Sequence, residues 1–141
     1  MTDPTPDPRT GVVGQINRPE VVAELRRAFE QYEADLVAND VDALIDWFWD
    51  DERAVRYGID EGHQGHAAIA EYRRSQAVAT PPRSLRNTVI TTFGRDLGTA
   101  DTEFLPTGSD AVGRQSQTWI RVDGQWRVAS AHVSWLGGRR P

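Results

Sequence analysis

The chain contains no cysteine and no lysine, and it has no long apolar run. Without cysteine, a disulfide framework, a thiolate nucleophile and a cysteine-type zinc site are all excluded. Because all 16 basic residues are arginine, Schiff-base chemistry and a P-loop lysine are excluded as well. No apolar segment approaches the length of a membrane span or of a signal-peptide core, so we expect a cytoplasmic protein.

Size and charge are those of an ordinary acidic domain. A chain of 141 residues with 38% hydrophobic and 26% charged residues can bury about two thirds of its unfolded surface in one core. The formal net charge of −5 disfavours nucleic acid and anionic membranes as partners. We therefore predict a single globular domain.

The two ends of the chain differ in composition from the rest. Residues 1–14 hold three prolines and little apolar surface, too little to offset the entropy lost on ordering. We predict a disordered tail at residues 1–14, a folded domain at residues 15–136 and a short tail at residues 137–141.

Apolar periodicity predicts three helices early in the domain. Asn17 and Glu20 fit a capping box at the start of the first helix. Its buried stripe is expected to comprise Val22, Leu25, Phe29, Tyr32 and Leu36. Asn39 suits the left-handed position that ends this helix, and Asp40 suits the N-cap of the second helix. A third helix is expected at residues 66–76.

Strand signals dominate the second half of the chain. A short strand is expected at residues 54–57, between the second and third helices. The four later strands are expected at residues 86–93, 97–104, 112–122 and 125–135. Helices on one face of a curved, mainly antiparallel sheet define an α+β domain.

Several motifs resemble a known family. Residues 39–51 (NDVDALIDWFWDD) and 117–134 (QTWIRVDGQWRVASAHVS) are similar to a helix and the closing hairpin of the cone-shaped SnoaL-like, cystatin-like superfamily, related to nuclear transport factor 2 and ketosteroid isomerase. The segments AVRYG, RNTVITTFGRD, TADTEF and GRQSQTWIR together resemble the AtzH/HpxZ family. Those small proteins are encoded beside amidase genes in cyanuric-acid and oxalurate catabolism. The resemblance covers residues 15–136.

The resemblance carries functional implications. The cyanuric-acid member of the family is proposed to act on 1,3-dicarboxyurea and to release allophanate. A tyrosine of the first helix and an arginine of the first strand are implicated there, and by motif they fall on Tyr32 and Arg56. The resemblance also implies a homodimer and a functional link to an amidase and its small subunit.

The residues themselves leave two interpretations of each of these positions. Tyr32 is either an ordinary core tyrosine or a phenol donor aimed into the cone. Arg56 is either a solvated arginine on an edge strand or a guanidinium beneath the helices. In the second case it needs a carboxylate, from the protein or from a substrate, because burying an unpaired charge is costly.

Five further residues are candidates for substrate binding. Gln115 and Gln117 share one strand face, which is either a solvated or dimer-facing surface or a site for a planar, urea-like ligand. Trp49 either roofs the cavity or belongs to the core. Of Tyr72 and Arg73 on the third helix, one is expected to face the pocket mouth.

The histidines raise the question of a metal. His63 and His66 lie three residues apart in an expected loop, and no further ligands stand at a readable spacing. We therefore predict no metal and no cofactor.

The turn at Asp123–Gly124 decides the face of His132. A two-residue turn with regular pairing would place His132 on the face of Gln117. A three-residue loop with a bulge would pair Gln117 with Ala129 and place His132 on the opposite face. The family resemblance favours the bulge, and His132 is then interpreted as a hydrogen-bonded packing residue rather than a general base.

The residues and the family resemblance together support one functional hypothesis, and two alternatives remain. The hypothesis is a small cofactor-free hydrolase of C–N bonds in a carboxylated urea, with Arg56 binding a carboxylate and Tyr32 donating to the group that gains charge. The first alternative is a non-catalytic module for ligand binding or assembly that supports a neighbouring amidase. The second is an isomerase or dehydratase like ketosteroid isomerase, which would need a carboxylate base in place of Arg56.

Overall fold

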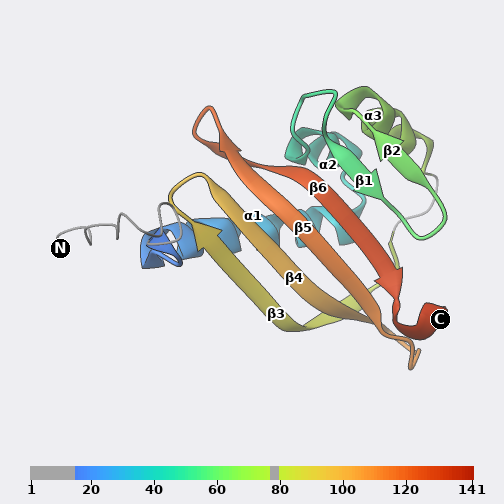
Figure 1. Cartoon of the computed structure of the whole chain (residues 1–141). Helices are drawn as coiled ribbons and strands as arrows, with labels where there is room; N and C mark the ends of the chain where they lie inside the picture. Colours follow the sequence, from blue (N-terminus) through green and yellow to red (C-terminus); the bar gives the residue numbers. More distant parts are fainter. Residues whose placement is uncertain (1–14, 77–79) are drawn as a thin grey trace.

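The computed structural model describes residues 15–76 and 80–141, so the tail predicted at residues 1–14 lies outside the described residues. Three helices pack on one face of a six-stranded sheet (Figure 1). The helices are α1 (Pro19–Ala38), α2 (Val41–Trp47) and α3 (His66–Ser75). The strands are β1 (Val55–Tyr57), β2 (Gly62–Gln64), β3 (Arg83–Phe93), β4 (Leu97–Pro106), β5 (Gly113–Val122) and β6 (Gln125–Trp135), followed by the short helical turn η2 (Leu136–Gly138).

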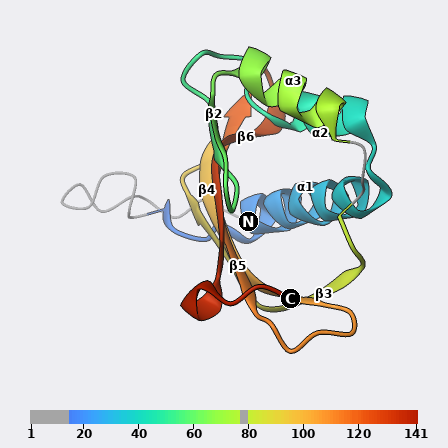
Figure 2. The ribbon, with the colours of Figure 1, turned by 90° about the vertical axis from the view of Figure 1, so that its right-hand side faces the viewer.

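The sheet is mainly antiparallel, with the strand order β2-β1-β6-β5-β4-β3. β1 runs parallel to β6, and the other four neighbouring pairs are antiparallel. Seen edge-on in Figure 2, the curved sheet carries all three helices on a single side. The predicted α+β cone, with three helices on a curved and mainly antiparallel sheet, is therefore confirmed.

The long helix α1 is amphipathic and supplies one side of the core. Its buried residues are Val21, Leu25, Phe29, Tyr32 and Leu36, so Val21 takes the place predicted for Val22. This stripe packs with Phe48 and Trp119 in the main hydrophobic cluster. None of the helices within residues 15–76 and 80–141 is long and apolar enough to cross a membrane.

The start of α1 differs from the predicted capping box. The N-cap is Arg18, which makes no side-chain capping bond, and Asn17 adopts a left-handed conformation with φ of 58°. The side-chain Oδ1 of Asn17 accepts a hydrogen bond from the backbone nitrogen of Thr92 at 2.9 Å. The backbone nitrogen of Asn17 donates to the backbone oxygen of Thr92, also at 2.9 Å. Asn17 therefore bonds to the edge strand β3 instead of capping the helix.

The predicted junction between α1 and α2 is confirmed. Asn39 has φ of 53° at the end of α1, and the Asp40 side chain accepts from the backbone nitrogen of Ala43 at 3.2 Å. α2 ends at Trp47, because Phe48 turns to an extended conformation. The backbone nitrogen of Trp49 then donates to Val128 of β6, which ties this segment to the sheet.

Strand β2 was missed, because three residues are too few for a periodic signal. The residues predicted as a loop pair instead with β1, where Arg56 lies opposite His63. The helix predicted at residues 66–76 is confirmed, because α3 begins at His66 and ends at Ser75.

The β5–β6 turn also differs from prediction. Val122 pairs with Gln125, so Asp123 and Gly124 form a two-residue turn, with φ of 50° and 76°, and the predicted three-residue loop is wrong.

A bulge lies further along the β5–β6 pair. The register shifts between Thr118 and Trp119, and Gln117 pairs with Ala131 instead of the predicted Ala129. This shift leaves His132 on the face opposite Gln117, as predicted, although for a different reason. In the single chain His132 is exposed, and its ring meets Tyr57 edge-on at 5.6 Å.

Two arginines of the C-terminal segment, which is predicted as a short tail at residues 137–141, form ion pairs. Arg139 forms an ion pair with Asp110 at 2.9 Å, and Arg140 pairs with Asp60. Both pairs are exposed, so each contributes little to stability on its own.

Candidate functional site

A cavity of about 750 Å³ opens between the helices and the inner face of the sheet. α1 and α3 supply one side of its lining, and β1, β3, β4, β5 and β6 supply the other. All the predicted site residues except Trp49 line it: Tyr32, Arg56, Tyr72, Arg73, Gln115 and Gln117. The fold therefore brings together side chains from four separate parts of the sequence.

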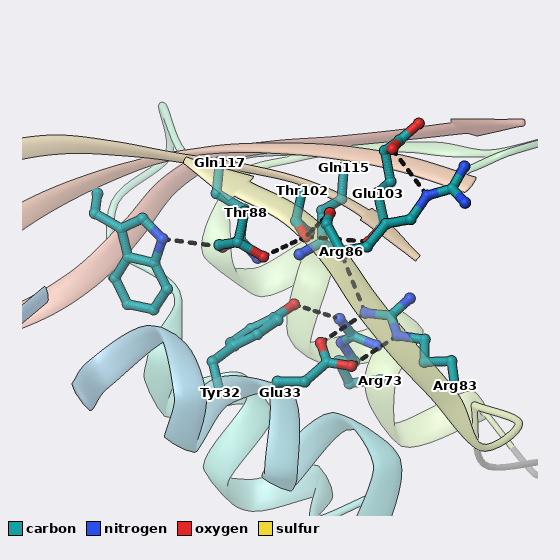
Figure 3. A network of polar contacts seen from close by, with 11 residues as sticks. Tyr32, Glu33, Arg73, Arg83, Arg86, Thr88, Thr102, Glu103, Gln115 and Gln117 are labelled. Carbon is teal, nitrogen blue, oxygen red and sulfur yellow. Dashed lines mark hydrogen bonds and ion pairs between the residues drawn. The ribbon is translucent and has the colours of Figure 1, made fainter. Parts of the chain in front are cut away.

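Tyr32 comes from the buried stripe of α1 and is 4% exposed. Its ring packs edge-on against Phe48 and Trp119, with centroid distances of 6.4 and 6.0 Å. The hydroxyl oxygen accepts a hydrogen bond from Arg73 Nη2 at 3.2 Å (Figure 3). Because the oxygen is the acceptor in this bond, the O–H of the phenol remains available as a donor to a ligand.

Arg56 lies at the centre of β1, opposite Ala131 of the parallel strand β6. Its side chain is 13% exposed, its Nη1 lies 3.1 Å from Glu61 Oε1, and its guanidinium stacks over the Tyr72 ring at 4.3 Å. The sequence left open whether a carboxylate would come from the protein or from a ligand. In the structure the protein provides one, and the charge of Arg56 is balanced by Glu61.

The Glu61 carboxylate is held ionised by this contact. Burial alone would raise the pKa of Glu61, but hydrogen bonds from Arg56, Tyr72 and the Asp60 backbone outweigh burial and lower its pKa below the ordinary value. Gly58 leaves the room that the carboxylate occupies, because a Cβ on Gly58 would lie 1.9 Å from Glu61 Oε1. The sequence could have indicated Glu61, because it is an acidic residue between Gly58 and Gly62, shortly after Arg56.

Arg73 comes from the last turn of α3 and is 7% exposed. Its Nη2 donates to Tyr32, and its Nε is buried without a hydrogen-bond partner in the described ranges. No carboxylate within residues 15–76 and 80–141 forms an ion pair with it. Arg73 thus differs from Arg56 in carrying a buried charge that no described residue balances.

Arg83 and Glu33 form a second ion pair at the cavity, which the sequence reasoning missed. Arg83 Nε and Nη2 each lie 2.7 Å from a Glu33 oxygen, in a bidentate arrangement (Figure 3). The Arg83 side chain is 5% exposed and stacks over Phe104 at 4.3 Å. Alternation along β3 could have indicated Arg83, because Arg83 and Leu85 lie on the same face of the strand and both are partly buried.

The two glutamines of β5 are buried and have fixed orientations. Gln117 Oε1 accepts from Trp119 Nε1 at 2.9 Å, and Gln115 Oε1 accepts from Arg83 Nη2 at 3.2 Å. Because indole and guanidinium nitrogens only donate, both amide oxygens must face these partners. The amide NH₂ groups remain as donors, and Gln115 Nε2 is buried without a partner in the described part of the chain.

Trp49 does not roof this cavity. It lines a separate hollow with Phe48 and His66, and Arg53 stacks over its ring at 5.0 Å. Tyr72 and Arg73 both line the cavity, although only one of them was expected there.

The histidines have separate surroundings. The His63 ring lies 4.5 Å from that of Tyr72, whereas His66 Nε2 lies 3.0 Å from the Ile45 oxygen. Within residues 15–76 and 80–141, no three histidine, aspartate or glutamate side chains are grouped so as to hold a metal ion.

Comparison with known proteins places this fold and site in context. The sequence matches the model of the AtzH-like family over residues 14–139. A protein of unknown function from Pectobacterium atrosepticum is 45% identical, with 86% of this chain and 94% of that chain covered and a TM-score of 0.82. A cystatin-like fold protein from Burkholderia xenovorans is 41% identical, with 86% and 95% covered and a TM-score of 0.81. A comparison with curated proteins finds no match.

The fold extends to more distant proteins. An NTF2-like protein of unknown function from Pseudomonas putida is 21% identical, with 82% of this chain and 86% of that chain covered and a TM-score of 0.68. The family model spans nearly all of the described residues, and the two structures above 40% identity match this chain over almost their whole length. The chain therefore belongs to the AtzH-like family and has its cone-shaped, SnoaL-like fold.

Proposed function

We propose that this protein is a cofactor-free amidohydrolase that acts on a carboxylated urea of the 1,3-dicarboxyurea type and releases allophanate. One observation carries the proposal: the buried polar side chains in the described lining of the cavity offer donors to a ligand. They are the Tyr32 hydroxyl, the Arg73 guanidinium and the amide NH₂ groups of Gln115 and Gln117. A set of donors selects a ligand made of acceptors, and a carboxylated urea presents two carboxylates and a carbonyl.

The same lining argues against isomerisation or dehydration of apolar substrates. Such chemistry needs a free carboxylate base. Three carboxylates at the described cavity, those of Glu33, Glu61 and the lining residue Asp110, are each paired with an arginine. The lowered pKa of Glu61 makes its carboxylate a weaker base.

In the proposed reaction, the bond between one urea nitrogen and its carboxyl carbon breaks. The electron pair stays with the urea group, and Tyr32 donates its hydrogen bond or proton to the atom that gains charge. With one water consumed, the dianion yields allophanate and bicarbonate, so atoms and charge balance. Arg56 binds a carboxylate and orients the substrate. A donor placed at the developing charge lowers the barrier by about 2.7–4 kcal/mol.

The test is turnover by the purified chain with no amidase present. Loss of dicarboxyurea and appearance of allophanate, followed by NMR, should exceed the uncatalysed rate. Tyr32→Phe removes one hydroxyl and keeps the ring packing, so it should fold and lose at least ~10²-fold in kcat/KM, about 2.7 kcal/mol.

Binding of the substrate without turnover would instead favour the non-catalytic module. The homodimer and the link to an amidase with its small subunit, both implied by the family resemblance, remain part of this proposal. Light scattering tests the dimer, since a monomer at micromolar concentration would contradict it.

A further inference from the structure

We infer that Arg73 is a carboxylate-binding residue of this cavity and that it acts together with Tyr32. A ligand carboxylate supplies the negative charge that no described residue supplies to the buried Arg73 guanidinium. The inference deepens the proposed function and rests on it for the identity of the substrate. The binding of a carboxylate itself can be tested without any turnover.

The three arginines that line the cavity differ in the partners of their guanidinium groups. Arg56 is paired with Glu61 at 3.1 Å, and Arg83 is held by both oxygens of Glu33 at 2.7 Å. Arg73 is 7% exposed, yet its hydrogen-bond partner in the described ranges is the neutral hydroxyl of Tyr32.

Burial makes this difference significant. An ionised side chain removed from water is stabilised only when a counter-charge or several hydrogen bonds replace its hydration. The guanidinium of Arg73 has five donor hydrogens, and one of its nitrogens, Nε, is buried with no partner in the described part of the chain. The site is therefore prepared for an acceptor that carries negative charge.

The neighbours of Arg73 define what kind of anion fits. Its Nη2 lies 3.2 Å from the Tyr32 oxygen, so a carboxylate on this guanidinium lies beside the phenol. Arg56 and Arg73 also share one aromatic neighbour, since their guanidinium carbons lie 4.3 and 5.8 Å from the centre of the Tyr72 ring. Two guanidiniums around one ring fit a small dicarboxylate, with one carboxylate at each arginine.

Malonate, a stable dicarboxylate, is the probe. Titration calorimetry and thermal unfolding of the full chain should show binding, with Tm raised by about 5–10 °C at one hundred times Kd. Malonamide at the same ionic strength keeps the size and removes the charge, so it should leave Tm unchanged. In Arg73→Met the Kd for malonate should rise at least ~10-fold, because a charge-assisted contact is lost.

The Tm of ligand-free Arg73→Met is a second measurement, and it distinguishes a ligand-binding role of Arg73 from a structural one. If the buried charge of Arg73 awaits a ligand, its removal should leave the Tm of the ligand-free protein unchanged or raise it. Arg74→Met is the matched control, because Arg74 is the next residue of α3, is exposed and changes the net charge equally. That variant should keep the wild-type Tm and malonate affinity.

Three results would overturn the inference. Wild-type protein that does not bind malonate at millimolar concentration would do so, as would Arg73→Met with an affinity within about twofold of wild type. Arg73→Met that fails to fold, or melts several degrees lower without ligand, would make Arg73 a structural residue. Failure of the hydrolase proposal looks different: malonate binding would depend on Arg73 while dicarboxyurea is not turned over.

Discussion

Glu61 and Arg56 form an ion pair at the cavity, with Glu61 Oε1 3.1 Å from Arg56 Nη1. The glutamate side chain is 34% exposed and follows a short strand, so it can move aside more easily than a buried partner. If Arg56 binds a ligand carboxylate as proposed, Glu61 competes with that carboxylate, and ligand affinity should depend on how firmly Glu61 is held.

Glu61→Gln should tighten malonate binding about three- to tenfold, because the neutral amide no longer competes as an anion for Arg56. Titration calorimetry measures the change. Asp60→Asn is the matched control: it removes the same charge from the neighbouring residue, whose partner is Arg140. Equal tightening in both variants would point to net charge instead of the Arg56 contact.

Gly58→Ala should act in the opposite direction. The added Cβ would lie 1.9 Å from Glu61 Oε1 and 3.1 Å from Arg56 Nη1, so the methyl group fills the space beside Arg56 that any carboxylate needs. The affinity for malonate should therefore fall below that of wild type in Gly58→Ala, and it should stay low in the double variant with Glu61→Gln. Titration calorimetry measures both variants, and an affinity equal to or above that of wild type would contradict this geometry.

The lowered pKa of Glu61 predicts a pH dependence of stability. Below its ordinary value of 4.5, the unfolded chain binds a proton at Glu61 that the folded chain does not. The stabilisation from this group is therefore complete above that pH and is lost as the pH falls through the lower folded-state pKa. Urea unfolding should show wild type losing stability relative to Glu61→Gln as the pH falls from 6 to 3. Parallel curves would contradict the assignment.

Glu33→Gln should destabilise the protein by about 3 kcal/mol, because it leaves the buried Arg83 guanidinium without a counter-charge. Urea denaturation at neutral pH measures the loss. Glu30→Gln is the control, since Glu30 is exposed on the same helix and its change should stay within ~0.5 kcal/mol. Equal stability of the two variants would mean that the Arg83–Glu33 pair contributes nothing net.

Local signals predicted most of the fold. The stripe of α1 follows from apolar spacing, and the Asn39–Asp40 junction follows from local backbone and side-chain preferences. These features depend on residues within one or two turns of each other, so the sequence records them directly. Local signals failed where a residue distant in the sequence provides the hydrogen-bond partner. Asn17, for example, fits a helix cap but bonds to Thr92 of β3.

The sequence by itself determined the fold class, the inward face of Tyr32, the shared face of Gln115 and Gln117, and the exclusion of thiol and lysine chemistry. Only the tertiary structure decided which charges are balanced. Arg56 and Arg83 receive carboxylates from Glu61 and Glu33, while Arg73 receives a phenol. Alternation and helical period specify the face on which a side chain lies, but not the partner that packing places opposite it. Tyr32 and Arg73 are 41 residues apart, and only the packing of α3 beside α1 brings them into contact.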